Sequence, residues 1–149
     1  MIEKLSPRQK EVLREQIVAF AKKYIGTPYE YGAPLRDKPG AFDCSGFVQF
    51  IYKHFGYEIP RSTIQQAEFI KKTVRDVRKI EVGDLIYLHG VRGYYTKKYP
   101  AGIGHVVMYI GNGEIIHAGG IGKKQGVQID SIKKVVSSRK PLVVIKRVV

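Results

Sequence analysis

The start of the chain has the pattern of an amphipathic helix. Ser6-Pro7-Arg8-Gln9 combines a hydroxyl cap, a proline at the first helical position and a glutamine three residues after the cap. Apolar residues then recur at helical spacing, and Gly26-Thr27-Pro28 ends the pattern. We therefore predict a helix with a buried stripe formed by Val12, Leu13, Ile17, Phe20 and Tyr24.

A second helix follows a segment rich in proline and glycine. Residues 28–40 contain three prolines and two glycines, which predicts an ordered loop without regular structure. Asp43 is placed to cap a helix running from about Cys44 to His54, and Gly56 is placed to end it. Cys44 therefore falls in the first turn of this helix.

A third, shorter helix is predicted after residue 61. Ser62-Thr63-Ile64-Gln65 repeats the capping pattern of the first helix. The segment that follows, residues 71–79, carries five positive charges and one negative charge. We expect this segment to be solvent-exposed surface.

The second half of the chain has the pattern of strands. Gly111-Asn112-Gly113 marks a hairpin turn between two of them. Helices followed by strands predict an α+β fold, with the helices packed on a mostly antiparallel sheet. At 149 residues and without an internal repeat or linker, we expect one domain over residues 1–149. The predicted strands cover residues 84–88, 105–110, 114–118, 127–129 and 142–149.

Composition narrows the class of protein. Hydrophobic residues at 44% and charged residues at 26% exclude collagen-like, coiled-coil and wholly disordered chains. The net charge is +13, and residues 61–149 carry 17 positive against 6 negative side chains. Such an excess favours polyanionic partners, so a basic module that binds nucleic acid or wall polymer is one alternative. The lysines are scattered and no nucleic-acid motif is present, so we expect no nucleic-acid partner.

The single cysteine is the first candidate for chemistry. A lone cysteine is commonly a small buried hydrophobe, and it cannot form an intrachain disulfide. Cys44, however, falls in a first helical turn, where the helix dipole and unpaired N–H groups favour a thiolate. The same N–H groups are placed to hold an oxyanion. Cys44 is therefore a candidate nucleophile.

Two of the four histidines are the best candidates for a general base and its orienting partner. His54 is about 15 Å along the helix from the cysteine, at 1.5 Å per residue, and is too far away. His105 and His117 fall on neighbouring predicted strands, while His89 precedes a long loop and is a rival base. A zinc site made of the cysteine and the strand histidines lacks compact ligand spacing, so we expect no metal or cofactor.

The hairpin register decides whether His105 and His117 share a face of the sheet. A two-residue loop would place His117 opposite Met108 and send the two imidazoles to opposite faces. A three-residue loop would place His117 opposite Val107, on the face that carries His105. We therefore predict a loop of residues 111–113, or an equivalent bulge. The alternative is that each histidine is an ordinary strand residue without a catalytic partner.

Five motifs follow one another along the chain: PYEYG at 28–32, FDCSGFVQ at 42–49, PRS at 60–62, VGDL at 82–85 and GHVVMYIG at 104–111. Together, and in this order, they resemble the NlpC-type cysteine peptidases, which are bacterial cell-wall endopeptidases with a papain-like fold. The resemblance covers roughly residues 20 to 130, and it implies that Cys44 is the nucleophile, His105 the general base and His117 the residue that orients the base.

The resemblance also implies the residues that bind substrate. Asp43 and Ser45 flank the cysteine and inherit a role in recognising the substrate peptide, often through its free amino terminus. Tyr31 is expected beside the thiol, and Arg61 matches a position near the groove. Each charged residue has a second explanation, because Asp43 caps a helix and an arginine before a helix cap is commonly structural.

The activity that the resemblance implies is hydrolysis of peptidoglycan stem peptides at the bond between γ-D-glutamate and the diamino acid. The expected partners are muropeptides. The alternative is an amidase or acyltransferase that uses the same triad on a non-wall substrate. No membrane span or signal peptide is expected. The location is the cell envelope or outside the cell if a leader was removed, and otherwise the cytoplasm, as in wall recycling or a phage lysin.

Two features depart from the family pattern. The connection at residues 91–104 is longer than expected for the family, and we expect no appended wall-binding module. Tyrosines and lysines in this loop are candidates to form a wall of the substrate groove. The alternative is an exposed loop of variable sequence. These residues are Tyr94, Tyr95, Lys97, Lys98 and Tyr99.

Overall fold

A computed structural model describes residues 4–90, 94–121, 124–139 and 142–149. Within these ranges an antiparallel sheet has the strand order β1-β6-β2-β3-β4-β5, which confirms the predicted α+β class. The elements in chain order are α1 (Pro7–Lys22), α2 (Cys44–His54), α3 (Thr63–Phe69), β1 (Lys72–Thr73), the 3₁₀ helix η2 (Val77–Lys79), β2 (Leu85–Leu88), β3 (His105–Gly111), β4 (Glu114–Ile121), β5 (Lys124–Ser131), α4 (Ile132–Arg139) and β6 (Leu142–Arg147).

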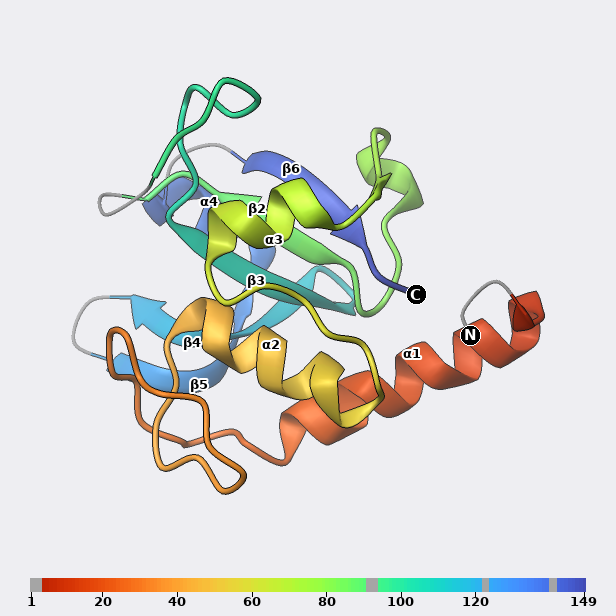
Figure 1. Cartoon of the computed structure of the whole chain (residues 1–149), viewed down its shortest axis with the longest axis horizontal. Helices are drawn as coiled ribbons and strands as arrows, with labels where there is room; N and C mark the ends of the chain where they lie inside the picture. Colours follow the sequence, from red (N-terminus) through yellow and green to blue (C-terminus); the bar gives the residue numbers. More distant parts are fainter. Residues whose placement is uncertain (1–3, 91–93, 122–123, 140–141) are drawn as a thin grey trace.

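The three predicted helices form where their caps indicate. In α1, Ser6 Oγ accepts a hydrogen bond from the Gln9 N–H at 3.1 Å, and Gln9 Oε1 accepts one from the Ser6 N–H at 2.8 Å. The predicted stripe is only partly buried, because Ile17 is fully buried while Val12 is 36% exposed. Figure 1 shows the reason: the N-terminal half of α1 extends beyond the sheet.

Both faces of the sheet are covered. On one face α2 packs on β3 and β4, and α1 runs alongside α2 (Figure 1). On the other face a second apolar cluster includes Val107 and Ile115 from the sheet, Val135 from α4 and Val74. The side chains of β2 are buried throughout because this strand has neighbours on both edges and cover on both faces.

Three elements, β1, η2 and α4, were not predicted. The segment at residues 71–79 was expected to be solvent-exposed surface. Lys72 is exposed, but Lys72–Thr73 pairs with β6 and Val74 is buried, so the prediction is wrong for Val74. The helix α4 contacts β4 and β5. Val74 and Val135 of α4 add apolar side chains to the face of the sheet opposite α2.

The hairpin between β3 and β4 combines a tight turn with a bulge. Asn112 and Gly113 have φ values of 54° and 73°, the positive values of a two-residue type I′ turn. Gly111 pairs with Glu114 across this turn, and the register then shifts between Tyr109 and Gly111. The predicted three-residue loop is therefore wrong, and the equivalent bulge is confirmed. The bulge shifts the pairing of the rest of the hairpin by one residue.

Lys146 is a buried cation in β6. Its Nζ donates to Thr73 Oγ1 at 2.8 Å. Burial, with repulsion from Lys98 and Arg75, lowers the pKa of Lys146 below its ordinary value of 10.5. The unfolded chain therefore binds this proton more tightly than the folded chain does. Between the lowered pKa and about 10.5, the contribution of Lys146 makes the free energy of unfolding rise with pH.

Replacing Lys146 with methionine tests this account. We expect Lys146→Met to raise the free energy of unfolding by about 1 kcal/mol at pH 7, because it removes a buried charge. The advantage is expected to shrink as the pH approaches 10 and the wild-type amine loses its proton. Urea denaturation at both pH values measures the difference, with the exposed Lys72→Met as the control. Equal or lower stability of Lys146→Met at pH 7 would contradict the account.

Candidate active site

Cys44 is the first residue of α2 and is 8% exposed. Asp43 is the N-cap in extended conformation, and its Oδ1 accepts from the Gly46 N–H at 2.7 Å. The thiol therefore lies at the positive end of the helix dipole, as predicted. The helix that carries Cys44 packs on β3, the strand that begins with His105.

A pocket of about 350 Å³ opens at Cys44. The four predicted substrate-binding residues all contribute to its wall, although Tyr31 is 56% exposed. Gly104, the residue before His105, also lines it. The full lining is Tyr29, Tyr31, Gly32, Asp43, Cys44, Ser45, Arg61, Ser62, Thr63, Tyr94 and Gly104.

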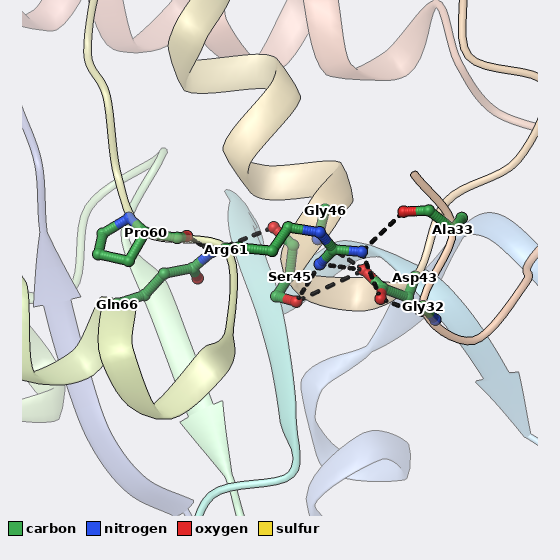
Figure 2. Close-up of polar contacts among 8 residues, drawn as sticks. All are labelled: Gly32, Ala33, Asp43, Ser45, Gly46, Pro60, Arg61 and Gln66. Atoms are coloured by element: carbon green, nitrogen blue, oxygen red, sulfur yellow. Dashed lines mark hydrogen bonds and ion pairs between the residues drawn. The ribbon is translucent and has the colours of Figure 1, made fainter. Parts of the chain in front are cut away.

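The Asp43 carboxylate accepts hydrogen bonds on both of its oxygens (Figure 2). Oδ1 accepts from Arg61 Nη1 at 2.9 Å as well as from Gly46, and Oδ2 accepts from Arg61 Nη2 at 2.7 Å and from the Gly32 N–H at 3.1 Å. A Cβ on Gly46 would lie 2.8 Å from Asp43 Oδ1, so the close cap requires glycine at that position. Asp43 thus joins the loop before α2 to the first turn of α2.

Arg61 completes this cluster from the segment that precedes α3. Figure 2 shows its guanidinium between Asp43, Ser45 and the Ala33 carbonyl. Nη1 donates to Ser45 Oγ at 2.9 Å, and Nη2 donates to the Ala33 oxygen at 2.7 Å. The structure therefore brings together three of the predicted substrate-binding residues, and the charges of Asp43 and Arg61 compensate one another at the pocket wall.

A buried amide supports the same turn from behind. Gln66 is fully buried, and its Nε2 donates to the Ser45 carbonyl at 3.1 Å and to the Pro60 carbonyl at 2.8 Å. Its Oε1 accepts from the Tyr87 hydroxyl at 3.0 Å. Burial, followed by the nearby Tyr52, Cys44 and Tyr99 groups, raises the pKa of Tyr87 well above its ordinary value. Tyr87 therefore remains a hydrogen-bond donor, and every polar atom of the amide is satisfied.

His105 and His117 are hydrogen-bonded to one another. His105 Nε2 lies 2.8 Å from His117 Nδ1, and both side chains are buried. Met108 pairs with Ile116, which is the register that brings the two histidines to one face. On its other side, His117 Nε2 lies 2.8 Å from Asp130 Oδ2. The predicted histidine pair therefore exists, with a carboxylate behind it that the sequence analysis did not identify.

The other two histidines lie elsewhere. His89 Nδ1 is 2.7 Å from the Ala101 carbonyl oxygen, so the rival base contacts the loop that precedes β3. His54 stacks on Phe20 with the ring centroids 3.8 Å apart. In the described ranges, no group of three histidine, cysteine or acidic side chains is placed to hold a metal ion.

The long connection before His105 has internal structure. Residues 91–93 lie outside the described ranges, and from Tyr94 onward the chain folds back, with Tyr94 and Ile103 forming an antiparallel bridge. Tyr94 lines the pocket, as expected for a groove wall. Tyr99 does not, because it is buried and its hydroxyl donates to the Ala67 carbonyl. An added Cβ on Gly104 would lie 2.7 Å from Gly90 Cα, so the two ends of the connection touch backbone to backbone.

Asp130 and Gln66 are the site residues that sequence reasoning missed. The prediction ended the relevant strand at residue 129, whereas β5 extends to Ser131. His117 of β4 pairs with Gln128 of β5, so Asp130 lies diagonally opposite His117 on the same face. The signal in the sequence was that Gln128 and Asp130, two positions apart, are both polar and so lie on one face of a strand. Gln66 has no signal beyond being a polar residue on a helix.

The NlpC/P60 family profile matches residues 26–146. The chain belongs to the NlpC/P60 family. The resemblance read from the five motifs is thereby confirmed.

Curated relatives in the NlpC/P60 family are much longer than this chain. It is 32% identical over 116 residues to a probable endopeptidase p60 of Listeria seeligeri, covering 78% of this chain and 19% of that protein. It is 35% identical over 103 residues to the gamma-DL-glutamyl hydrolase of Bacillus subtilis, covering 68% of this chain and 22% of the relative. The chain thus spans about a fifth of the length of these relatives.

Solved NlpC/P60 structures share the fold. The NlpC/P60 domain of the peptidoglycan hydrolase SagA has a TM-score of 0.67 at 29% identity, covering 90% of this chain and 97% of that one. NlpC1 of Trichomonas vaginalis has a TM-score of 0.71 at 26% identity, over 90% and 43% of the respective chains. RipD of Mycobacterium tuberculosis, described as a non-catalytic NlpC/P60 domain protein, has a TM-score of 0.64 at 22% identity over 91% and 97%. Because RipD shares the fold, an activity must be argued from the site.

No helix in the described part of the chain is long and apolar enough to cross a membrane.

Substitution of Gly119 tests the packing of the histidine pair. An added Cβ would lie 2.8 Å from His105 Cε1 and 3.3 Å from His117 Nδ1. We expect Gly119→Ala to lower the free energy of unfolding by about 1–3 kcal/mol, because the buried rings must move. Gly40→Ala is the matched control, since a Cβ there meets no atom within 4 Å. Urea denaturation measures both, and equal stability of the two variants would contradict the packing.

Substitution of Arg61 tests the ion pair at the pocket wall. We expect Arg61→Ala to cost about 1–3 kcal/mol of stability, because Asp43, whose side chain is 11% exposed, would lose its counter-ion. Arg8→Ala is the control, because the Arg8–Glu11 pair is exposed and we expect a loss below about 0.5 kcal/mol. Thermal and urea denaturation of both variants decide the comparison. Equal losses for the two variants would show that the Asp43–Arg61 pair adds nothing to the free energy of unfolding beyond an exposed pair.

Proposed function

We propose that this chain is a cysteine endopeptidase that hydrolyses peptidoglycan stem peptides, at the bond between γ-D-glutamate and the following diamino acid. The observation that carries the proposal is the 2.8 Å contact between His105 and His117, on strands packed beneath the helix that begins with Cys44. The names of the relatives, an endopeptidase and a gamma-DL-glutamyl hydrolase, support the bond class.

In the proposed mechanism, His105 removes the thiol proton of Cys44 and the sulfur attacks the carbonyl carbon of the scissile bond. The oxyanion that forms is held by N–H groups of the first turn of α2, with Tyr31 as a further donor at the pocket wall. Because the Gly46 N–H already donates to Asp43, the N–H groups before it carry this role.

The protonated His105 then gives its proton to the departing amine, and the C–N bond breaks. The acyl group remains on Cys44 as a thioester. Water, deprotonated by His105, attacks the thioester and releases the carboxylic acid, and the proton returns to the sulfur. His117 orients His105 throughout, which is the role that a third polar group has in related triads.

The pocket wall is proposed to recognise the peptide on either side of the scissile bond. Asp43, Ser45 and Arg61 present their polar groups as one connected cluster beside the thiol. Because Arg61 compensates the Asp43 charge, the cluster is suited to hydrogen bonding with peptide groups as well as to a terminal amine. Tyr94, 64% exposed at the far wall, is placed to contact the substrate side chains.

Mass spectrometry of muropeptides tests the proposal. Muropeptides containing either L-lysine or meso-diaminopimelate are incubated with wild type and with Cys44→Ala. We expect wild type to release fragments that end at D-glutamate, and Cys44→Ala to be at least about 1,000-fold slower because it lacks the nucleophile. Since Cys44 is the single cysteine, alkylation of wild type is expected to abolish cleavage in the same way.

Two results would contradict the proposal. Cleavage by Cys44→Ala at the wild-type rate would exclude the thiol as nucleophile. Muropeptides left intact by a protein whose Cys44 alkylates readily near neutral pH would keep the nucleophile and support an amidase or acyltransferase with a non-wall substrate.

A further inference from the structure

Asp130 ends a line of three buried or half-buried polar side chains. The line runs from His105 on β3 through His117 on β4 to Asp130 on β5, with 2.8 Å at each of the two contacts. The His117 side chain is fully buried, and that of Asp130 is 18% exposed. Asp130 is not among the residues that line the pocket, and its carboxylate contacts the histidine pair at His117 Nε2.

Asp130, and not the residue of β5 directly opposite, is the one that contacts His117. Gln128 is the residue directly opposite His117 in the register, but its Nε2 donates to the Gly119 carbonyl at 2.9 Å. Asp130, two residues further along the same face, reaches His117 from the diagonal position. The carboxylate therefore meets the one imidazole nitrogen of His117 that His105 does not contact.

The chemistry of the three groups fixes the direction of their hydrogen bonds. A carboxylate only accepts, so Nε2 of His117 carries a hydrogen and donates to Asp130. The other nitrogen of a neutral imidazole is an acceptor, so Nδ1 of His117 accepts a hydrogen bond from Nε2 of His105. His105 is then left with its Nδ1 unprotonated. That nitrogen is the one able to take a proton from the thiol of Cys44.

We propose that Asp130 is a positioning residue that sets the tautomers of both histidines and so keeps His105 ready as a base. This inference rests on the proposed function, because it assigns His105 the role of general base. When the S–H bond of Cys44 breaks and an N–H bond forms on His105, the positive charge that results is stabilised along the same line by the Asp130 carboxylate. Asp130 itself gains no proton.

The tautomers are read directly by NMR of the free protein. In wild type labelled with ¹⁵N-histidine, we expect His117 to be protonated at Nε2 and not at Nδ1, and His105 to have the same tautomer. In Asp130→Ala and Asp130→Asn, we expect a mixture of tautomers at His117, because the obligatory acceptor is lost. Asp76→Asn, which removes a carboxylate that is paired with the exposed Arg78 and does not line the pocket, is the control and is expected to leave both tautomers unchanged.

Kinetics with muropeptides supply the second readout. We expect Asp130→Ala to lower kcat by about 10–100-fold with little change in KM, since Asp130 acts on the base and not on the substrate. Asp130→Asn keeps the shape of the side chain and guards against a loss that is due to misfolding, which circular dichroism of each variant also checks. Asp76→Asn is expected to keep the wild-type kcat.

The outcomes separate the two proposals. Wild-type tautomers and a kcat within twofold of wild type in both folded Asp130 variants would overturn the role of Asp130. If wild type leaves muropeptides intact, the proposed substrate fails, while the NMR comparison still decides whether Asp130 sets the tautomers. A lower kcat with unchanged KM, together with mixed tautomers at His117, would support the inference.

Discussion

The pairing register of β3 and β4 determines whether His105 and His117 can contact one another. Side chains alternate between the two faces of a strand, so a slip of one residue would carry His117 to the face opposite His105. The two-residue turn alone would produce that slip, and the bulge between Tyr109 and Gly111 reverses it. The contact of the two imidazoles and the need for glycine at 119 follow from this one irregularity. The diagonal approach of Asp130 to His117 depends instead on the register between β4 and β5.

The hydrogen bonds of the Asp43 carboxylate organise the segments around Cys44. It caps α2, and the same two oxygens hold Arg61 and the loop before the helix, so the segments on both sides of the thiol are fixed by one side chain. The sequence left open whether Asp43 is a helix cap or a recognition residue. The structure shows the cap, and the two roles are compatible because the cluster also borders the pocket.

Local signals in the sequence predicted much of this arrangement. Ser6, Asp43 and Ser62 act as caps, because the capping interaction is made within three residues of each. Pairing between distant segments was not predictable in the same way. Lys72–Thr73 forms β1 because it pairs with the edge of β6. The helix α4 does have a local cap, since Ser131 Oγ accepts from the Lys134 N–H at 3.1 Å, but the sequence analysis did not use it. Asp130 was missed because its contact depends on the register between β4 and β5, and Gln66 because its partners come from three separate segments.

The backbones of Gly90 and Gly104 touch where the connection between β2 and β3 leaves and re-enters the sheet. Leu88 accepts a hydrogen bond from the Gly104 N–H at 2.9 Å, so the chain leaves and re-enters the sheet at a single narrow neck. The strand ends that carry Leu88 and His105 pair directly with one another at this neck. The connection is thus a self-contained excursion in its described part: Tyr94 pairs with Ile103, and Tyr94 joins the pocket wall without interrupting the β2–β3 pairing that positions His105.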